Sequence, residues 1–581
     1  MSTSPTPTMS TSPTPDERRH DLDALRAAAM LLGIIYHVSL SFAEGFPWFI
    51  QDVAQSKSAF IFQAWVHGFR MPLFMLVSGF FTAMLWRQKG LKALLWHRCR
   101  RVLFPCLLGV VTLLPMVTLA AAFASERNAA NKRTAAKAEP ASANVWAAIQ
   151  LGDAVAMDAH LRNPATLTNL HPTFHLTPLT WAVLNGQNKI AVVLLDRGAG
   201  INERNSDGGT ALHSAAFLGR AEIGNLLLQR GANIHSKNTD GETALASAGR
   251  DFETVQFISG ILGIAVDRKA VEEGRRALIP RLGSKDLPSD SVVMVKVNAE
   301  SPNAWKRGGI IQLALTEWPI FSVLWFLWML VWLVAIFSIY ALVVERFRWR
   351  VRGHWLVLSP ANLLWLVPLT LIPATMMSHV EIIGIGPETS MSIIPMPHVL
   401  LYYMLFFFFG ALYYDCDDRA GRLGSSWRWL LPVTLIVIFP LALEFSTGSF
   451  GFRAALLPAK FHRPASVFFQ SLFAWTMSFA CIGLFRATLT RENRTLRYLS
   501  DSAYWLYLAH LPLCFVGQAI ISPWALPAWI KLPLLSLVLI ALLLLTYQFL
   551  VRYTWLGRML NGPRKRPSRN DAPNGIAIAS P

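Results

Sequence analysis

The feature that most constrains the fold is a series of apolar runs, each close to the ~20 residues that a helix needs to cross the hydrocarbon core of a bilayer. Such runs dominate the chain, because 53% of its 581 residues are hydrophobic and only 15% are charged. We therefore predict an all-α fold, a polytopic membrane protein of about ten transmembrane helices. The predicted spans are 22–43, 60–86, 101–122, 317–343, 355–378, 397–414, 428–445, 465–488, 499–521 and 530–553.

Basic residues cluster in the second, fourth and eighth connections between these spans and in the C-terminal tail, whereas acidic residues mark the first and fifth connections. Cytoplasmic loops carry an excess of Lys and Arg, so both termini are predicted to be cytoplasmic. The seventh connection, with Arg453, Lys460 and Arg463, is an exception to this pattern. Topology thus explains the formal charge of +18, and we predict no nucleic-acid partner.

A repeat occupies the hydrophilic stretch between the third and fourth spans. Its turn signals recur at a spacing of 33 residues, as Thr177-Pro178-Leu179, Thr210-Ala211-Leu212-His213 and Thr243-Ala244-Leu245. This period and these signatures resemble the ankyrin repeat, a turn followed by two helices. We predict an ankyrin-repeat solenoid at 140–267, with 144–170 as a diverged first repeat and 240–267 as a degraded last one, because stacked repeats need atypical ends.

The solenoid divides the membrane part into two pieces, 16–122 with three spans and 317–555 with seven. An odd number of spans precedes it, so the module is predicted on the outer side of the membrane, the periplasm in a Gram-negative cell. The remaining segments are a disordered tail rich in Ser, Thr and Pro at 1–15, a linker at 268–316 with a strand-like run at Val292–Val297, and a basic cytoplasmic tail at 556–581.

The first span carries two ionisable residues, Arg26 and His37. Eleven residues of helix make about three turns and ~16 Å, so the two side chains project from nearly the same face. Ionisable residues inside membrane helices usually face a protein interior or a wet cavity and mark function. The alternative is structural, with Arg26 extending to the lipid headgroups and His37 bonded to a neighbouring helix.

A second basic group begins the third span, where Arg98 and Arg101 are three residues apart at the same predicted depth as Arg26. Alone, such a cluster is equally well explained as an orientation signal. Three guanidinium groups at one depth would also form an anion site, because they hold phosphates bidentately and keep their charge. We predict that Arg26, Arg98 and Arg101 bind a phosphate-rich donor from the cytoplasm.

His37 is the candidate catalytic residue, as a general base or as a nucleophile that carries an acyl group. His510 in the ninth predicted span is a second candidate, with a hydrogen bond between helices as the equally strong alternative. His379, Glu381 and Glu388 in the outer fifth connection are candidate contacts of an acceptor, but we interpret them as solvated loop residues. None of the five cysteines lies in the hydrophilic middle, so neither a disulfide framework nor a metal site is predicted.

Several motifs resemble acyltransferase family 3, a family of integral membrane O-acyltransferases. They are the Arg26–His37 pattern preceded by Asp21-Leu22-Asp23, the Arg98–Arg101 pair, the run from Met71 to Phe81, Leu324-Trp325-Phe326-Leu327, and the run from Ser502 to His510. Within that family, the segment from Arg18 to Arg26 is most similar to the glucan biosynthesis protein C branch. The resemblance covers the whole membrane part.

The resemblance implies a membrane-bound acyltransferase in the inner membrane that takes an acyl group, succinyl or acetyl, from cytosolic acyl-coenzyme A. The acceptor would be a hydroxyl of a periplasmic glucan or another envelope saccharide. An ankyrin module departs from the usual domain organisation of this family. It would bind a protein partner or position the acceptor. The alternative is a catalytically inactive receptor or scaffold that displays the ankyrin surface, although such a protein would have no reason to keep charges in lipid.

Overall fold

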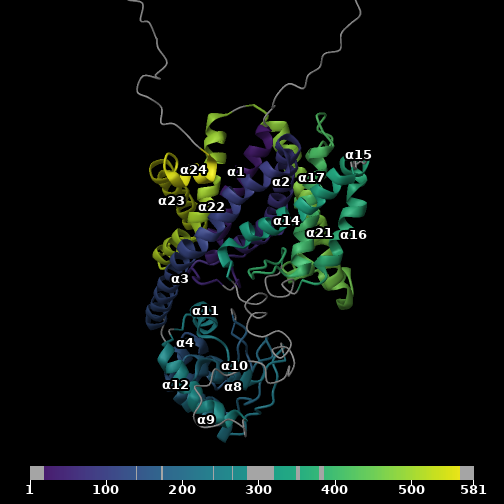
Figure 1. The fold of residues 1–581 in the computed structure, drawn as a ribbon. Helices are drawn as coiled ribbons and strands as arrows, with labels where there is room; N and C mark the ends of the chain where they lie inside the picture. Colours follow the sequence, from purple (N-terminus) through teal and green to yellow (C-terminus); the bar gives the residue numbers. More distant parts are fainter. Residues whose placement is uncertain are drawn as a thin grey trace, which may run out of the picture.

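The computed structural model describes residues 19–46, 48–138, 141–171, 174–239, 241–264, 266–283, 320–347, 354–377, 385–491 and 493–562. Within these ranges every regular secondary-structure element is a helix, which confirms the all-α class (Figure 1). The predicted tail at 1–15, the strand-like run Val292–Val297 and residues 563–581 of the tail predicted at 556–581 lie outside the described residues. The first residues of that second tail belong to a short helix, Trp555–Asn561.

A bundle of long apolar helices forms the membrane part. The long helices are α1 (His20–Ser39), α2 (Lys57–Arg98), α3 (Phe104–Ala138), α14 (Trp325–Phe347), α17 (Pro397–Asp415), α21 (His462–Thr488), α22 (Arg494–Ile521) and α23 (Ala528–Thr546). Shorter helices complete it: α15 (His354–Leu358), α16 (Leu363–Ala374), α18 (Trp427–Val433), α19 (Phe439–Thr447), α20 (Arg453–Leu456) and α24 (Trp555–Asn561). Large apolar side chains such as Val111, Leu537 and Phe549 point outward and are more than 60% exposed, as a lipid-facing surface requires.

Eight described segments are long and apolar enough to span a membrane, two fewer than the sequence suggests. Two features account for the difference. The segment Lys57–Asn128 is a single stretch of 72 residues that contains two predicted spans, with a non-helical Gly90 between them. The predicted span at 355–378 corresponds to the shorter apolar stretch Pro360–Ala374. The count of ten therefore stays a prediction.

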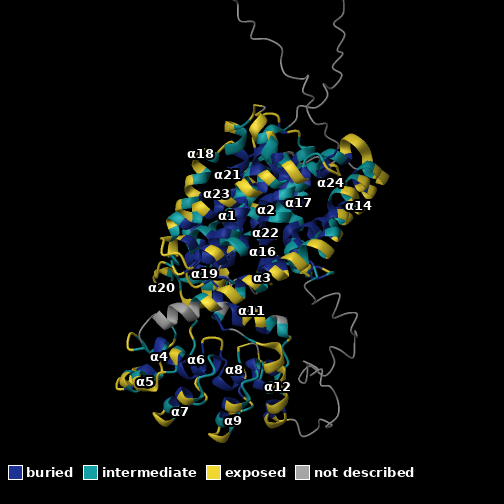
Figure 2. Ribbon diagram, turned by 90° about the vertical axis from the view of Figure 1, so that its left-hand side faces the viewer, coloured by how far each residue is buried: buried dark blue, intermediate teal, exposed yellow. Residues whose placement is uncertain are grey.

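The tightest contact in the bundle joins α2 and α17. A Cβ added at Gly79 would lie 1.8 Å from the carbonyl oxygen of Phe407, and one added at Gly410 would lie 1.9 Å from that of Leu76. The two backbones therefore touch, as small residues allow in membrane helices. This contact explains the glycine in the Met71–Phe81 motif and fixes α2 in the centre of the bundle (Figure 2).

The ankyrin repeats form a stack of paired short helices between α3 and α14. The pairs are α4 (Val145–Leu151) with α5 (Ala154–His160), α6 (Pro178–Leu184) with α7 (Asn188–Asp196), α8 (Ala211–Leu218) with α9 (Ala221–Gln229), and α10 (Ala244–Ala248) with α11 (Phe252–Leu262). In the third pair His213 bonds the backbone N–H of Thr210 and, through Nε2, the carbonyl of Glu242 in the next repeat. The repeated motif thus links neighbouring repeats.

The start of the predicted linker belongs to the stack instead. Residues Arg268–Leu278 form α12, followed by a 3₁₀ turn at Ile279–Leu282. Val271, Leu278 and Leu282 are buried against the repeats, at a helical spacing that the many charges of this segment concealed. Sequence analysis ended the module too early, because α12 serves as its C-terminal cap.

The stack lies at the end of the bundle away from α24 and the beginning of α1 (Figure 1). Helix α3 extends out of the bundle to reach it. Asn128 of α3 donates to the carbonyl of Gly260 in α11, while the neighbouring Arg127 donates to the carbonyl of Ala519 in α22. One helix thus contacts both the repeats and the bundle.

Candidate functional site

The two histidines singled out from the sequence lie together in the structure. The rings of His37 on α1 and His510 on α22 have centroids 5.0 Å apart. His510 Nδ1 is 2.7 Å from the carbonyl oxygen of Tyr507, which only accepts hydrogen bonds, so Nδ1 carries the proton and Nε2 of the neutral ring has a free lone pair. His37 Nδ1 and His510 Nε2 are both buried, and neither has a hydrogen-bond partner among the described residues.

Gln518 and the loop after α1 hold this pair in place. The Gln518 side chain donates to the carbonyls of His37 and Val38 and accepts a hydrogen bond from Trp48 Nε1. The loop containing Trp48 is anchored in turn by Asp52, whose carboxylate lies 2.6 Å from Lys531 Nζ, with both side chains fully buried. The loop thus holds Trp48 beside His37, with the two ring centroids 6.4 Å apart.

The three predicted donor-binding arginines also converge. Arg26 donates to Ser500 Oγ at 2.8 Å and lies 3.5 Å from Asp23, while Arg98 donates to Thr82 Oγ1 at 2.7 Å. Arg98 is close enough to Arg26 and Arg101 for direct electrostatic interaction. These like charges repel one another, so their grouping favours an anion between them.

The local helix geometry differs from the prediction at this cluster. Arg98 ends α2, and Arg101 lies in a π-helical turn, Cys99–Leu103, that joins α2 to α3. The pair therefore does not begin a regular third span. A π-helical turn often occurs at functional sites.

One face of α22 connects the arginine cluster to the histidine pair. Ser500, Tyr504, Tyr507 and His510 follow one another at intervals of four, three and three residues, which is the spacing of one helix face. Ten residues of helix span ~15 Å, similar to the ~16 Å between Arg26 and His37 on α1. The hydroxyl of Tyr504 is buried without a partner among the described residues.

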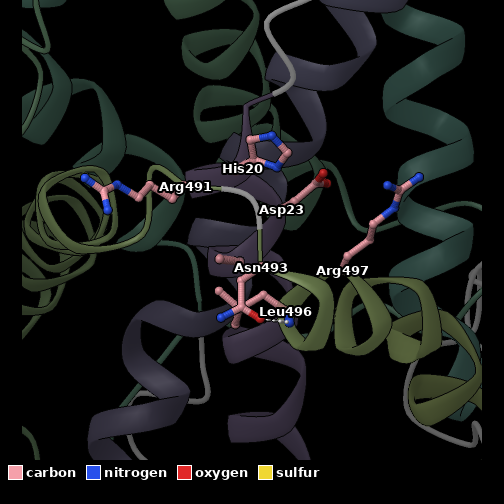
Figure 3. Close-up of a pocket in the computed structure, with 7 residues that line it drawn as sticks. His20, Asp23, Arg491, Asn493, Leu496 and Arg497 are labelled. Atoms are coloured by element: carbon pink, nitrogen blue, oxygen red, sulfur yellow. Dashed lines mark hydrogen bonds between the residues drawn. The ribbon is translucent and has the colours of Figure 1, made fainter. Parts of the chain in front are cut away.

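A small hollow lies beside the arginine cluster, between the beginning of α1 and the beginning of α22. Figure 3 shows His20 and Asp23 on one side of it, Asn493 and Leu496 on the other, and Arg491 and Arg497 extending to left and right. Sequence analysis treated Arg491 and Arg497 only as orientation signals. Their position next to Asp23 adds basic groups to this end of the site.

Sequence analysis missed Arg70, although Arg70 lies within a predicted span as Arg26 does. Its guanidinium stacks on the Tyr36 ring at 5.0 Å from the centroid. Tyr36 also contacts His67, with its hydroxyl 3.3 Å from His67 Nδ1. The rule that flagged Arg26, an ionisable residue in an apolar run, would have found Arg70 as well.

The fifth connection is also different from the prediction. His379 and Glu381 lie outside the described residues. Glu388, interpreted as solvated, is buried, and its carboxylate lies 2.9 Å from His398 Nε2. Because its partner is ten residues away on α17, no local pattern indicated this pair. Glu388 is therefore a structural residue rather than a candidate acceptor contact.

Comparisons with known proteins agree with the sequence motifs. A model described as an acyltransferase domain matches residues 19–176 and 282–550, and a model of three ankyrin repeats matches 145–238 and 181–270. Glucans biosynthesis proteins C of Escherichia coli strains SMS-3-5 / SECEC and K12 / DH10B are each 36% identical over 107 residues. These alignments cover 18% of this chain and 26% of the relatives, so the chain spans about a quarter of their length.

Proposed function

This chain belongs to the acyltransferase domain family, and on that premise we propose that it transfers an acyl group from acyl-coenzyme A to a hydroxyl group of a carbohydrate. The observation that carries the proposal is the polar face of α22, which runs from the partner of Arg26 to the histidine pair. The arginine cluster supplies charge for the phosphates of the donor. The unpartnered histidine nitrogens supply a base beside the reacting group.

The chemistry needs one proton transfer in each direction. His37 or its neighbour His510 removes the proton of the acceptor hydroxyl while the oxygen attacks the thioester carbon. The carbon–sulfur bond then breaks, and the imidazolium returns the proton to the departing coenzyme A thiolate. We assign the base to His37 and the positioning of its ring to His510, because α1 also carries Arg26.

The relatives' name, which refers to glucans, supports a glucan as the acceptor, and we propose succinyl or acetyl as the transferred group. We further propose an inner-membrane location with both termini cytoplasmic. The hollow with Arg491 and Arg497 then faces the cytosolic donor, and the ankyrin stack, at the other end of the bundle, faces the periplasm. There the stack would bind a protein partner or hold the acceptor near α22.

The test uses the purified full chain in lipid nanodiscs, with release of coenzyme A thiol from acetyl- and succinyl-coenzyme A as the readout. His37→Ala should abolish release in the presence of glucan while the protein remains folded. His462→Ala is the matched control, because the one hydrogen bond of its side chain within the described residues goes to the nearby carbonyl of Leu457. Normal turnover by His37→Ala would refute its role.

The donor site is tested separately by Arg98→Ala combined with Arg101→Ala. This variant should raise the KM for the coenzyme A ester at least tenfold. The control is Arg87→Ala, a basic residue on the same helix that is already paired with Asp415. Failure of the unmodified protein to release thiol from either ester would favour the inactive scaffold instead.

A further inference from the structure

Arg70 is a cation near the middle of the bundle, and no carboxylate of the described residues pairs with it. Its guanidinium fills the space beside Gly33, where a Cβ would lie 1.9 Å from Nη1. Its electrostatic neighbours are the phenolic groups of Tyr36, Tyr403 and Tyr507. Its Nε is buried with no hydrogen-bond partner among the described residues, and no salt bridge to it is found there.

Several other arginines of the bundle are paired with acids, whereas those of the arginine cluster other than Arg26 are assigned to the donor phosphates. Arg19 lies 2.7 Å from Asp21, Arg87 lies 2.7 Å from Asp415, and Arg26 lies 3.5 Å from Asp23. An unpaired charge inside a membrane bundle is expensive, so an arginine kept there without an acid indicates function. No acid among the described residues supplies the matching negative charge, so a bound molecule can supply it.

The position of Arg70 indicates where that charge arises. Arg70 interacts electrostatically with both His37 and His510. The side chains of Arg70, His37 and Tyr507 are partly exposed even though α1, α2 and α22 pack around them, so water or a substrate can reach them. The phosphates of the donor are assigned to the arginine cluster, about three helical turns away along α1. They are therefore not the negative charge that Arg70 would bind.

We propose that Arg70 is a catalytic residue that stabilises the oxyanion of the acyl-transfer reaction. This inference rests on the proposed function. When the acceptor oxygen bonds to the thioester carbon, the carbonyl π electrons move onto its oxygen, and the guanidinium N–H groups donate to that oxygen. When the carbonyl forms again, the carbon–sulfur bond breaks and the thiolate takes the proton from His37. Gly33 leaves the room in which the guanidinium lies.

Arg70→Gln tests the proposal because it removes the charge and keeps much of the side chain. Loss of one oxyanion donor typically lowers kcat by about 10²–10³-fold. We expect a fall of this size with acetyl-coenzyme A, a KM for the donor within about threefold of normal, and unchanged binding of free coenzyme A. Arg70→Lys should keep more activity than Arg70→Gln, because lysine keeps the positive charge although it lacks the planar guanidinium group.

Arg87→Gln is the matched control, on the same helix and already paired with an acid; its kcat should be unchanged. If Arg70→Gln does not fold, the neutral variant Arg70→Met decides the question, and a normal kcat in either neutral variant overturns the proposal. A raised KM with succinyl-coenzyme A and normal kinetics with acetyl-coenzyme A would also overturn it, since Arg70 would then bind the acyl carboxylate. Inactivity of the unmodified protein would instead refute the proposed function.

Discussion

The buried pair of Asp52 and Lys531 gives the sharpest prediction about stability. Nζ of Lys531 lies 2.6 Å from the Asp52 carboxylate, and its other contacts are the carbonyls of Ile521 and Ser522 at 3.5 and 3.4 Å. Both side chains are fully buried. Asp52→Asn would leave the ammonium group without a counter-charge in this site. Removing one partner of such a pair costs about 3–5 kcal/mol.

This cost should appear as local opening of the loop at 43–56, since Asp52 joins that loop to α23. At about 1.4 kcal/mol per factor of ten, it corresponds to exchange of loop amides up to roughly 10²–10³-fold faster. Hydrogen exchange followed by mass spectrometry measures this directly. The loop places Trp48 beside His37, so the variant should also hydrolyse more donor for each acyl group that it transfers.

The double variant Asp52→Asn with Lys531→Met is the control. It removes both charges and replaces them with groups of similar volume, which is often neutral for stability. We expect exchange in the loop to return to within about tenfold of the unmodified protein. Unchanged exchange in Asp52→Asn alone would show that the ion pair does not hold the loop, and the reasoning above would fail.

Three further predictions concern other parts of the molecule. Gly79→Ala should destabilise the bundle by about 1–3 kcal/mol, seen as a lower Tm, because its Cβ meets the backbone of Phe407; Gly517→Ala, which meets only the Leu535 side chain, should cost less. Ser500→Ala should raise the donor KM about tenfold at unchanged kcat, because Arg26 loses a hydrogen bond. Burial lowers the pKa of His213 below 6.5, so its contribution to the stability of the repeats is present above pH 6.5 and is lost as the pH falls through the lowered value. Hydrogen exchange of the α8 amides should therefore accelerate in acid, and this acceleration should be absent from the His213→Asn variant.

Local patterns in the sequence were sufficient for the class of fold and for the repeats. The apolar runs and the 33-residue period each depend on short-range spacing, which the chain displays directly. The contact of His37 with His510 depends on two helices more than 470 residues apart, and each residue was flagged only because an imidazole in an apolar run is unusual. The sequence alone contained no sign that the two rings meet.

Other features depend on the three-dimensional arrangement. Glu388 looked solvated because its partner, His398, lies across a turn on another element. The charges of α12 concealed its apolar face. Arg70 lies outside the spacing that joins Arg26 to His37. Its exceptional property, a positive charge with no acid beside it among the described residues, becomes visible only when its neighbours are known.

Helix α3 has a consequence for how a foreign module can be built into a membrane protein. It runs without a break from Phe104 to Ala138, 35 residues or ~52 Å, and it ends at the repeats. The stack is therefore attached to the bundle through α3, and the number of residues in α3 sets its orientation about the helix axis. One residue inserted after Ala124 would rotate everything beyond it by ~100° and advance it by ~1.5 Å, which would move Arg127 away from the carbonyl of Ala519 in the bundle.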